Sequence, residues 1–283
     1  MLACPVVLVK TTISHEVTGE CIVGGDQMKG YMAIGLAVCG NICNHIASTV
    51  PYQKLINSSN FMNDLDELNH ALVAKLQQFG EEARINGNLF YDHALKDFHL
   101  QPLTDKGLEV KRRRLYKAAR RSNSMLEIGV NGGHSALLAL SSNEKLHLTG
   151  IDICRQLVNT WCRVDVYVPK AFGWLASRFK DRVTLIEGHS LVESARYATN
   201  PFSRKIDLLH LDGAKDNYYK EFLLLRPRLS SDCLVILDDS NMPVVNDIVC
   251  KLISDGLLYE HPDFPEMKES NVYRNSILCA SKL

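Results

Sequence analysis

A glycine-rich loop and the acid that follows it have the most specific chemistry in this 283-residue sequence. Gly129, Gly132 and Gly133 come after a short apolar run, and glycine allows a backbone to approach a ligand closely. A second apolar run closes on Asp152, whose carboxylate can accept hydrogen bonds from both hydroxyls of a ribose. This order of strand, loop, helix, strand and acid predicts a unit that binds a nucleoside.

A second acid narrows the kind of ligand that this loop would hold. Glu127 lies two residues before Gly129, where its carboxylate would repel a pyrophosphate but suits a ligand with an amine and a sulfonium. The glycine spacing also differs from the G-x-G-x-x-G spacing of dinucleotide-binding loops. Two alternatives stay open, which are a nicotinamide or other nucleotide site and a purely structural turn.

The segment EIGVNGGHS, residues 127–135, resembles motif I of the class I S-adenosylmethionine-dependent methyltransferases, with its E-x-G-x-x-x-G core. The resemblance implies S-adenosylmethionine as the cofactor, and it places the loop at 187–190 against the adenine. For His189 in that loop, helix capping is the alternative role. The cofactor-binding residues implied in this way are Glu127, Gly129, Asn131, Gly132, Gly133, Ser135, Asp152, His189, Ser190 and Asp212.

Carboxylates also follow two later apolar runs. Asp212 comes directly after the run at 205–211, and Asp238 and Asp239 stand at the end of the run at 232–237. Neighbouring parallel strands end at one edge of a sheet, so we expect these three carboxylates around one point. Three acids repel one another unless a cation is present, and oxygen ligands suit Mg²⁺ or another divalent ion. Capping of the following helix is the alternative role of Asp212.

Lys215 lies three positions after Asp212, and a partly buried lysine near a cation can lose its proton and act as a base. The arrangement D-x-x-K-D-N-Y with a later acid pair at a strand end resembles the metal-dependent catechol and caffeoyl-coenzyme A O-methyltransferases. The resemblance implies that Asp212, Asp238 and Asp239 hold the metal and that Lys215 takes the proton of the acceptor hydroxyl. A solvated lysine without a catalytic role is the alternative.

Two features differ from the pattern of that family. It usually ends its metal motif in Asp-Asn, whereas this chain has Asp238-Asp239. The acid pair and the preceding HLDG are more similar to the sugar and macrolide O-methyltransferases, which also use a divalent ion. Within HLDG, we interpret His210 as a core or wall residue.

The combined residues predict methylation of a hydroxyl on a small molecule, with a catechol-like compound or a vicinal diol as the favoured acceptor. Adjacent hydroxyls can chelate the ion. One alternative is a metal-independent methyltransferase that acts on nitrogen or on a macromolecule. The other is a non-catalytic or NAD-type nucleotide-binding protein.

Alternating strands and helices must position these residues. Five apolar runs separated by helical segments predict an α/β fold with a mostly parallel, doubly wound, Rossmann-like sheet. Two β-like stretches in the tail, 257–260 and 271–280, predict an antiparallel pair. The resemblance implies seven strands, of which the last is antiparallel. The predicted strands before the tail are 125–128, 146–151, 182–186, 205–211 and 232–237.

The N-terminal part is expected to form a partly helical extension, residues 1–103, before a methyltransferase domain at 104–283. Leucines at spacings of three and four predict an amphipathic helix over 64–83. A further helix over 107–119, capped by Thr104, contains the basic run Lys111–Arg114, which we interpret as a solvated face. The resemblance implies that the N-terminal extension covers the cofactor and substrate cleft.

The composition argues against large charged partners. Lysine plus arginine and aspartate plus glutamate number 32 each, so no net field draws the chain to nucleic acid or a membrane. The apolar segment 31–50 carries Asn41, Asn44 and His45, which argues against a membrane span. Nine cysteines without C-x-x-C spacing predict a reducing, cytoplasmic environment. The sequence leaves open whether the chain forms a homo-oligomer.

Overall fold

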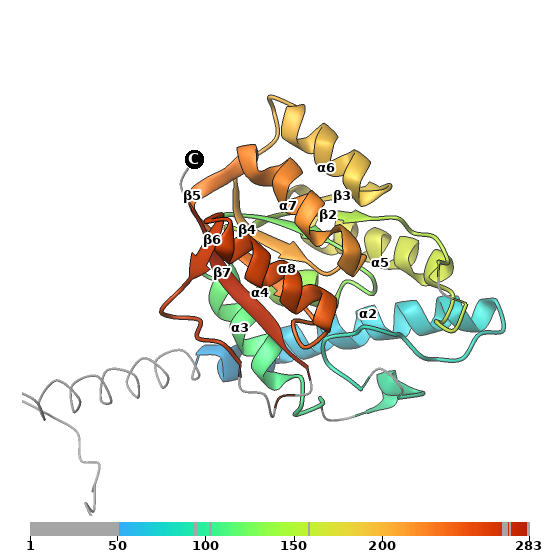
Figure 1. Ribbon diagram of the computed structural model, residues 1–283. Coiled ribbons are helices and arrows are strands. Elements are labelled where there is room, and N and C mark those ends of the chain that lie inside the picture. The colour runs from blue at the N-terminus through green and yellow to red at the C-terminus, as the bar shows by residue number, and fades with distance from the viewer. Residues whose placement is uncertain are drawn as a thin grey trace, which may run out of the picture. The chain divides into compact units, whose positions relative to one another are not determined.

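The computed structural model describes residues 51–92, 95–101, 104–157, 159–267, 271 and 273–281, and the segment at 31–50 lies outside them. Within these residues the centre is a seven-stranded sheet with the order β3-β2-β1-β4-β5-β7-β6 (Figure 1). The strands are β1 Ser124–Ile128, β2 His147–Asp152, β3 Val183–Glu187, β4 Ile206–Leu211, β5 Leu229–Asp238, β6 Leu258–Glu260 and β7 Asn275–Ala280.

The pairing of the strands confirms the predicted fold. Strands β1 to β5 run parallel, and β7 is antiparallel to both β5 and β6. Every residue of β1 is buried, because the central strands of a parallel sheet are covered on both faces. The carboxyl ends of β1, β2, β4 and β5 therefore meet at one edge of the sheet.

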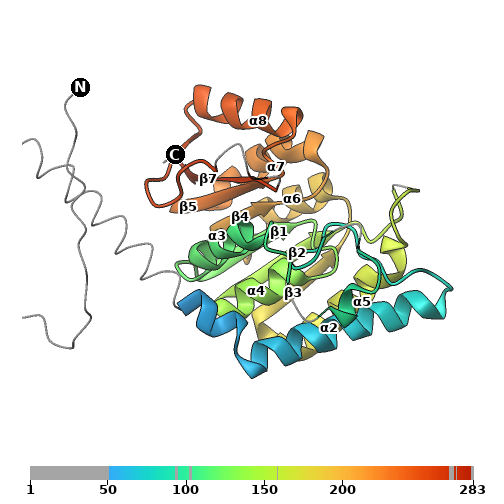
Figure 2. The same cartoon turned by 90° about the horizontal axis from the view of Figure 1, so that it is seen from below.

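Helices cover the sheet on both faces, as Figure 2 shows. One face carries α3 Glu109–Ala119, α4 His134–Ser142 and α5 Val164–Phe179, and the other carries α6 Ser190–Thr199, α7 Tyr218–Leu225 and α8 Pro243–Ser254. Each layer has its own cluster of buried apolar side chains, which is the burial that a doubly wound sheet requires. None of the helices in the described ranges is long and apolar enough to cross a membrane.

Helix α2, Ser59–Gln78, packs outside α4 and α5 and forms an extra layer on that face (Figure 2). Its bounds correct the predicted range of 64–83. Ser58 starts the helix early, because its hydroxyl caps the amide of Phe61 at 3.3 Å. Gly80, with φ of +71°, follows its end.

Helix α3 departs from prediction in two ways. It begins at Glu109 without a side-chain cap, and Thr104 instead accepts a hydrogen bond from Arg112 at 3.3 Å. The basic run was expected to be solvated, but Lys111 and Arg112 are buried. Arg112 donates to backbone carbonyls of the preceding segment, including that of Asp105 at 2.7 Å. The prediction was wrong because α3 lies between the sheet and the N-terminal segment, where its basic side chains find buried acceptors.

Candidate active site

A cavity of about 570 Å³ lies at the carboxyl ends of β1, β2, β4 and β5. The segment 86–89 from the N-terminal part contributes to its wall, in keeping with the covering role expected of that region. Among the described residues, Glu127 and Gly133 are predicted site residues that do not line this cavity. The predicted residues that do line it are Gly129, Asn131, Gly132, Ser135, Asp152, His189, Ser190, Asp212, Lys215, Asp238 and Asp239.

The glycine loop joins the two halves of the cavity. Gly129 has φ of +88°, and a Cβ at this position would lie 2.6 Å from the carbonyl oxygen of Asp212. Only glycine permits this approach, so the loop after β1 packs directly on the backbone after β4. Gly133, with φ of +78°, precedes α4, and a Cβ there would lie 2.9 Å from Leu175 on α5. Its role in this geometry is close helix packing.

Asp152 is held in a fixed orientation at the end of β2. The backbone amide of Asn131 donates to Oδ2 at 2.9 Å, and that of Cys154 donates to Oδ1 at 2.9 Å. Each carboxylate oxygen keeps acceptor capacity for a further donor. The residue is half-buried at the cavity wall. A fixed carboxylate with two available oxygens can bind the two hydroxyls of a ribose.

Both polar atoms of the Asn131 side chain are hydrogen-bonded to other residues of the protein. Its amide nitrogen donates to the carbonyl of Asn86 at 2.6 Å, and its amide oxygen accepts from the hydroxyl of Tyr167 at 2.5 Å. Asn131 also has φ of +51°, a conformation that asparagine tolerates better than most residues. It therefore shapes the loop through its backbone and ties it to the N-terminal segment.

Glu127 lies behind the cavity wall and is fully buried. Nδ1 of His210 donates to its Oε1 at 2.8 Å. Burial opposes the charged imidazolium, but Glu127 outweighs that effect and raises the pKa of His210. The other oxygen, Oε2, has no hydrogen-bond partner among the described residues. This leaves a buried acceptor next to the glycine loop.

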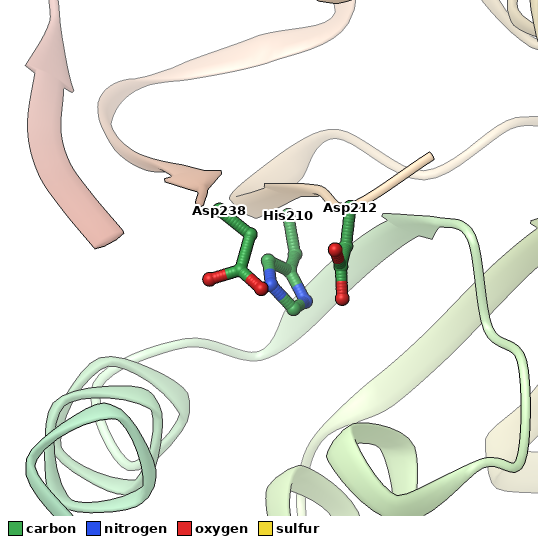
Figure 3. Close-up of side chains that lie close together, drawn as sticks. All are labelled: His210, Asp212 and Asp238. Carbon is green, nitrogen blue, oxygen red and sulfur yellow. The ribbon is translucent and has the colours of Figure 1, made fainter. Parts of the chain in front are cut away.

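Figure 3 shows His210 between Asp212 and Asp238, at the ends of two neighbouring strands. One ligand atom from each of these side chains lies within 4.8 Å of the others. Oδ1 of Asp238 is buried and lacks a hydrogen-bond partner among the described residues. Two carboxylates and an imidazole nitrogen are ligands that divalent metals accept in proteins, so these residues fit a cation. Asp239, the third predicted ligand, is not part of this cluster.

Two lysines contact the acids. Lys215 donates to Oδ1 of Asp212 at 2.9 Å and lies 3.0 Å from Oδ2 of Asp239. Lys111 donates to Oδ2 of Asp238 at 2.7 Å. Burial opposes the charge of both ammonium groups, but the neighbouring carboxylates outweigh it and raise both pKa values. Both lysines are therefore cations in this geometry.

His189 and Ser190 lie at the start of α6. Nδ1 of His189 accepts the amide of Leu191 at 3.3 Å and caps the helix. The capping alternative therefore describes what this side chain does, while both residues also line the cavity. Their contact with an adenine stays a prediction.

Sequence reasoning missed two residues of the site. His210 is the wall residue that was expected, but its position beside Asp212 as a candidate ligand was not foreseen. The HLDG segment contained that signal, since alternate residues at a strand end can both reach the edge. Lys111 was interpreted as solvated, and no local pattern connects it to Asp238.

Comparisons with known proteins agree with this geometry. A family profile described as a methyltransferase domain matches residues 126–240. The O-methyltransferase TomG from Streptomyces achromogenes, involved in tomaymycin synthesis and solved with SAM, has a TM-score of 0.52 at 14% identity, over 77% of this chain and 90% of TomG. An O-methyltransferase from Bacillus cereus in complex with SAH has a TM-score of 0.51 at 15% identity, over 82% of this chain and 96% of that one. A search of curated protein sequences finds no significant match.

The family match runs from β1 to just beyond β5 and contains the glycine loop, Asp152 and the acids of the cavity. The strand order and the antiparallel β7 agree with that match. The prediction of class is thereby confirmed at the level of the domain and the fold: residues 126–240 match a methyltransferase domain, and the fold is that of solved O-methyltransferases in complex with SAM or SAH.

Proposed function

We propose that the protein transfers the methyl group of S-adenosylmethionine to a hydroxyl of a small molecule, with a divalent cation at the acceptor end. The observation that carries this proposal is that the candidate ribose acceptor and the candidate cation ligands line the same cavity. Asp152 lines it as the candidate ribose acceptor, and His210, Asp212 and Asp238 line it as the candidate cation ligands. Gly129 joins these regions, because its loop packs on the backbone of Asp212.

For the cofactor, the proposed binding elements are the loop at 129–135 and the carboxylate of Asp152. The unpaired Oε2 of buried Glu127 supports a hydrogen-bond donor or cationic group nearby, because His210 contacts only the other oxygen of this carboxylate. The amine and the sulfonium of S-adenosylmethionine are such groups. His189 and Ser190 are proposed to border the adenine from the start of α6.

For the cation, Asp212 and Asp238 are the proposed oxygen ligands, completed by His210 or by Asp239. When bound, a divalent ion lowers the pKa of a hydroxyl and orients it. A set completed by Asp239 favours Mg²⁺ or Mn²⁺, whereas the imidazole of His210 also suits transition-metal ions such as Fe²⁺ or Zn²⁺. The buried, unpaired Oδ1 of Asp238 supports a ligand at this point.

The proposed reaction is an in-line displacement. The acceptor oxygen forms a bond to the methyl carbon while the carbon–sulfur bond breaks, its electron pair stays on sulfur, and the hydroxyl proton leaves to a base. Lys215 is the proposed proton acceptor. The contacts of Lys215 with Asp212 and Asp239 favour the ammonium, so it can act as a base only when the charge of these acids is compensated.

The acceptor is proposed to be a small molecule with adjacent hydroxyls. A cavity of about 570 Å³ falls in the range of small-molecule sites. The balance of basic and acidic residues gives no general attraction for nucleic acid.

The test is transfer of a labelled methyl group from S-adenosylmethionine to a panel of catechols and vicinal diols, with Mg²⁺ or Mn²⁺ and with EDTA. We expect labelled methyl ether and S-adenosylhomocysteine in equal amounts when an ion is present, and loss of both in EDTA. Undiminished turnover in excess EDTA would support the metal-independent alternative. Label on protein or nucleic acid, with none on the panel, would support a macromolecular acceptor.

A further inference from the structure

The basic run of α3 places one ammonium group at the acceptor end of the cavity. The side chain of Lys111 is only 6% exposed, and its Nζ lies 2.7 Å from Oδ2 of Asp238 and 3.6 Å from Oδ1 of Asp239. A lysine is seldom buried this far unless it is paired. Its pairing across the fold with the acids that follow β5 indicates a role in the site.

Lys111 and Lys215 alternate with the three acids. Lys215 lies between Asp212 and Asp239, at 2.9 and 3.0 Å. Lys111 lies between Asp239 and Asp238. Each carboxylate of the predicted metal set therefore has an ammonium partner from the chain. The repulsion among the acids, which by itself would require a metal ion, is already offset by side chains.

Lys111 also determines how Asp238 is presented. It binds Oδ2, while Oδ1 remains buried and without a hydrogen-bond partner among the described residues. A carboxylate held by one oxygen has lost most of its rotational freedom, so the other oxygen has a defined position. Asp238 is thus oriented as a ligand by contacts of the protein alone.

We propose that Lys111 is a positioning residue that acts as a fixed counter-charge: it holds Asp238 in place without a cation and lowers the affinity of the acid cluster for one. The inference rests on the cation site of the proposed function. A fixed ammonium beside the ligands repels a divalent ion. The cluster is accordingly ordered with or without the ion, and the ion binds weakly and reversibly.

The experiment is Mn²⁺ binding to cofactor-free protein, measured by titration calorimetry, in wild type and Lys111→Gln. Glutamine keeps a hydrogen-bond donor for Asp238 but removes the charge, which favours a folded variant. We expect the affinity for Mn²⁺ to rise roughly 10- to 100-fold, because a nearby positive charge is lost. We also expect Lys111→Gln to have a lower melting temperature than wild type in EDTA. Addition of Mn²⁺ should raise the melting temperature of this variant more than that of wild type.

Two variants control for charge and for general effects. Lys111→Arg keeps the positive charge, so its affinity for Mn²⁺ should stay within a few-fold of wild type. Lys251→Gln removes an exposed lysine on α8 that does not line the cavity and whose Nζ lies 2.9 Å from Oδ2 of Asp255. It should leave both Mn²⁺ binding and the effect of Mn²⁺ on melting unchanged.

Equal affinity for Mn²⁺ in wild type and Lys111→Gln would overturn the inference. Absence of Mn²⁺ binding in both proteins would refute the cation site, and the inference with it. Titration with S-adenosylhomocysteine in the same samples separates the two levels of failure. Retained binding of that ligand leaves the methyltransferase assignment intact, whereas its absence would count against the proposed function itself.

Discussion

The two ends of the cavity are built in different ways. The end proposed to bind the cofactor is local, since the loop from Gly129 and the carboxylate of Asp152 belong to one strand–helix–strand unit. The end proposed to bind the acceptor combines side chains from distant segments, and Lys111 and Asp238 are 127 positions apart. The cofactor end depends on backbone shape and the acceptor end on balanced charge. Substitutions should therefore affect binding at one end, and chemistry and stability at the other.

The largest effect is expected at Lys215. If Lys215 takes the hydroxyl proton, Lys215→Ala lowers kcat by roughly 10²–10⁴ and leaves the affinity for S-adenosylhomocysteine nearly unchanged. The loss should shrink as pH rises, because the hydroxyl then ionises without help. Lys220→Ala, an exposed lysine on α7, is the matched control. A wild-type kcat in Lys215→Ala between about pH 6 and 9 would contradict the role of Lys215 as a base. A raised KM at unchanged kcat would indicate that Lys215 positions the substrate.

Asp238→Asn should show how far the acceptor end depends on charge balance. It leaves the ammonium of buried Lys111 without its nearest carboxylate, and breaking a buried pair costs about 3–5 kcal/mol. Urea denaturation measures this loss, and activity should disappear with it. Asp255→Asn removes the acid of an exposed pair and should cost less than about 1 kcal/mol. Similar losses in the two variants would contradict the account.

Most of the fold could be predicted because its signals are local. Buried parallel strands appear as continuous apolar runs, and β1 and β2 lie within one residue of the predicted 125–128 and 146–151. Errors occurred where capping decides a boundary. Helix α2 begins at the Ser58 cap, a signal present in the sequence but overlooked.

The candidate site was predictable only in part. Asp152 and Asp238 end strands and Asp212 directly follows one, so their positions follow from topology. The burial of Lys111 follows from the packing of α3 against the sheet, which no short window of sequence contains. The pairing of Glu127 with His210 also could not be predicted from a short window of sequence, because it depends on the register of two neighbouring strands.

Glu221 is a buried acid on α7, and its pKa is influenced by Ser190 and Lys215, which both line the cavity. Burial raises the pKa of its carboxyl to about 7, while Ser190 and Lys215 oppose the shift. The folded state keeps this proton up to about pH 7 and the unfolded state only to about 4.5. The stabilising contribution is therefore complete below about pH 4.5 and is lost as pH rises to 7, by up to about 1.4 kcal/mol per pH unit.

Urea midpoints of wild type and Glu221→Gln between pH 5 and 8 would measure this effect. The glutamine variant lacks the titrating group, so its urea midpoint relative to that of wild type should rise as pH increases from 5 to 8. Parallel pH profiles would show that the carboxyl ionises normally.

A smaller effect is expected from Asp152→Ala at the cofactor end. A hydrogen bond to a charged acceptor contributes about 1.5–3 kcal/mol, so affinity for S-adenosylhomocysteine should fall roughly 10- to 150-fold. Asp181→Ala is the control, because Asp181 is an exposed acid in the turn before β3 and does not line the cavity. Unchanged affinity in Asp152→Ala would place the ribose elsewhere.

The central claim is that the cavity binds S-adenosylmethionine, and thermal unfolding with S-adenosylhomocysteine or NAD tests it most directly. A ligand at 100 times its dissociation constant stabilises the folded state by about 2.7 kcal/mol. We expect stabilisation by S-adenosylhomocysteine that follows its concentration and is weakened in Asp152→Ala, and none by NAD at the same concentrations. Stabilisation by NAD alone, or by neither ligand, would contradict the claim.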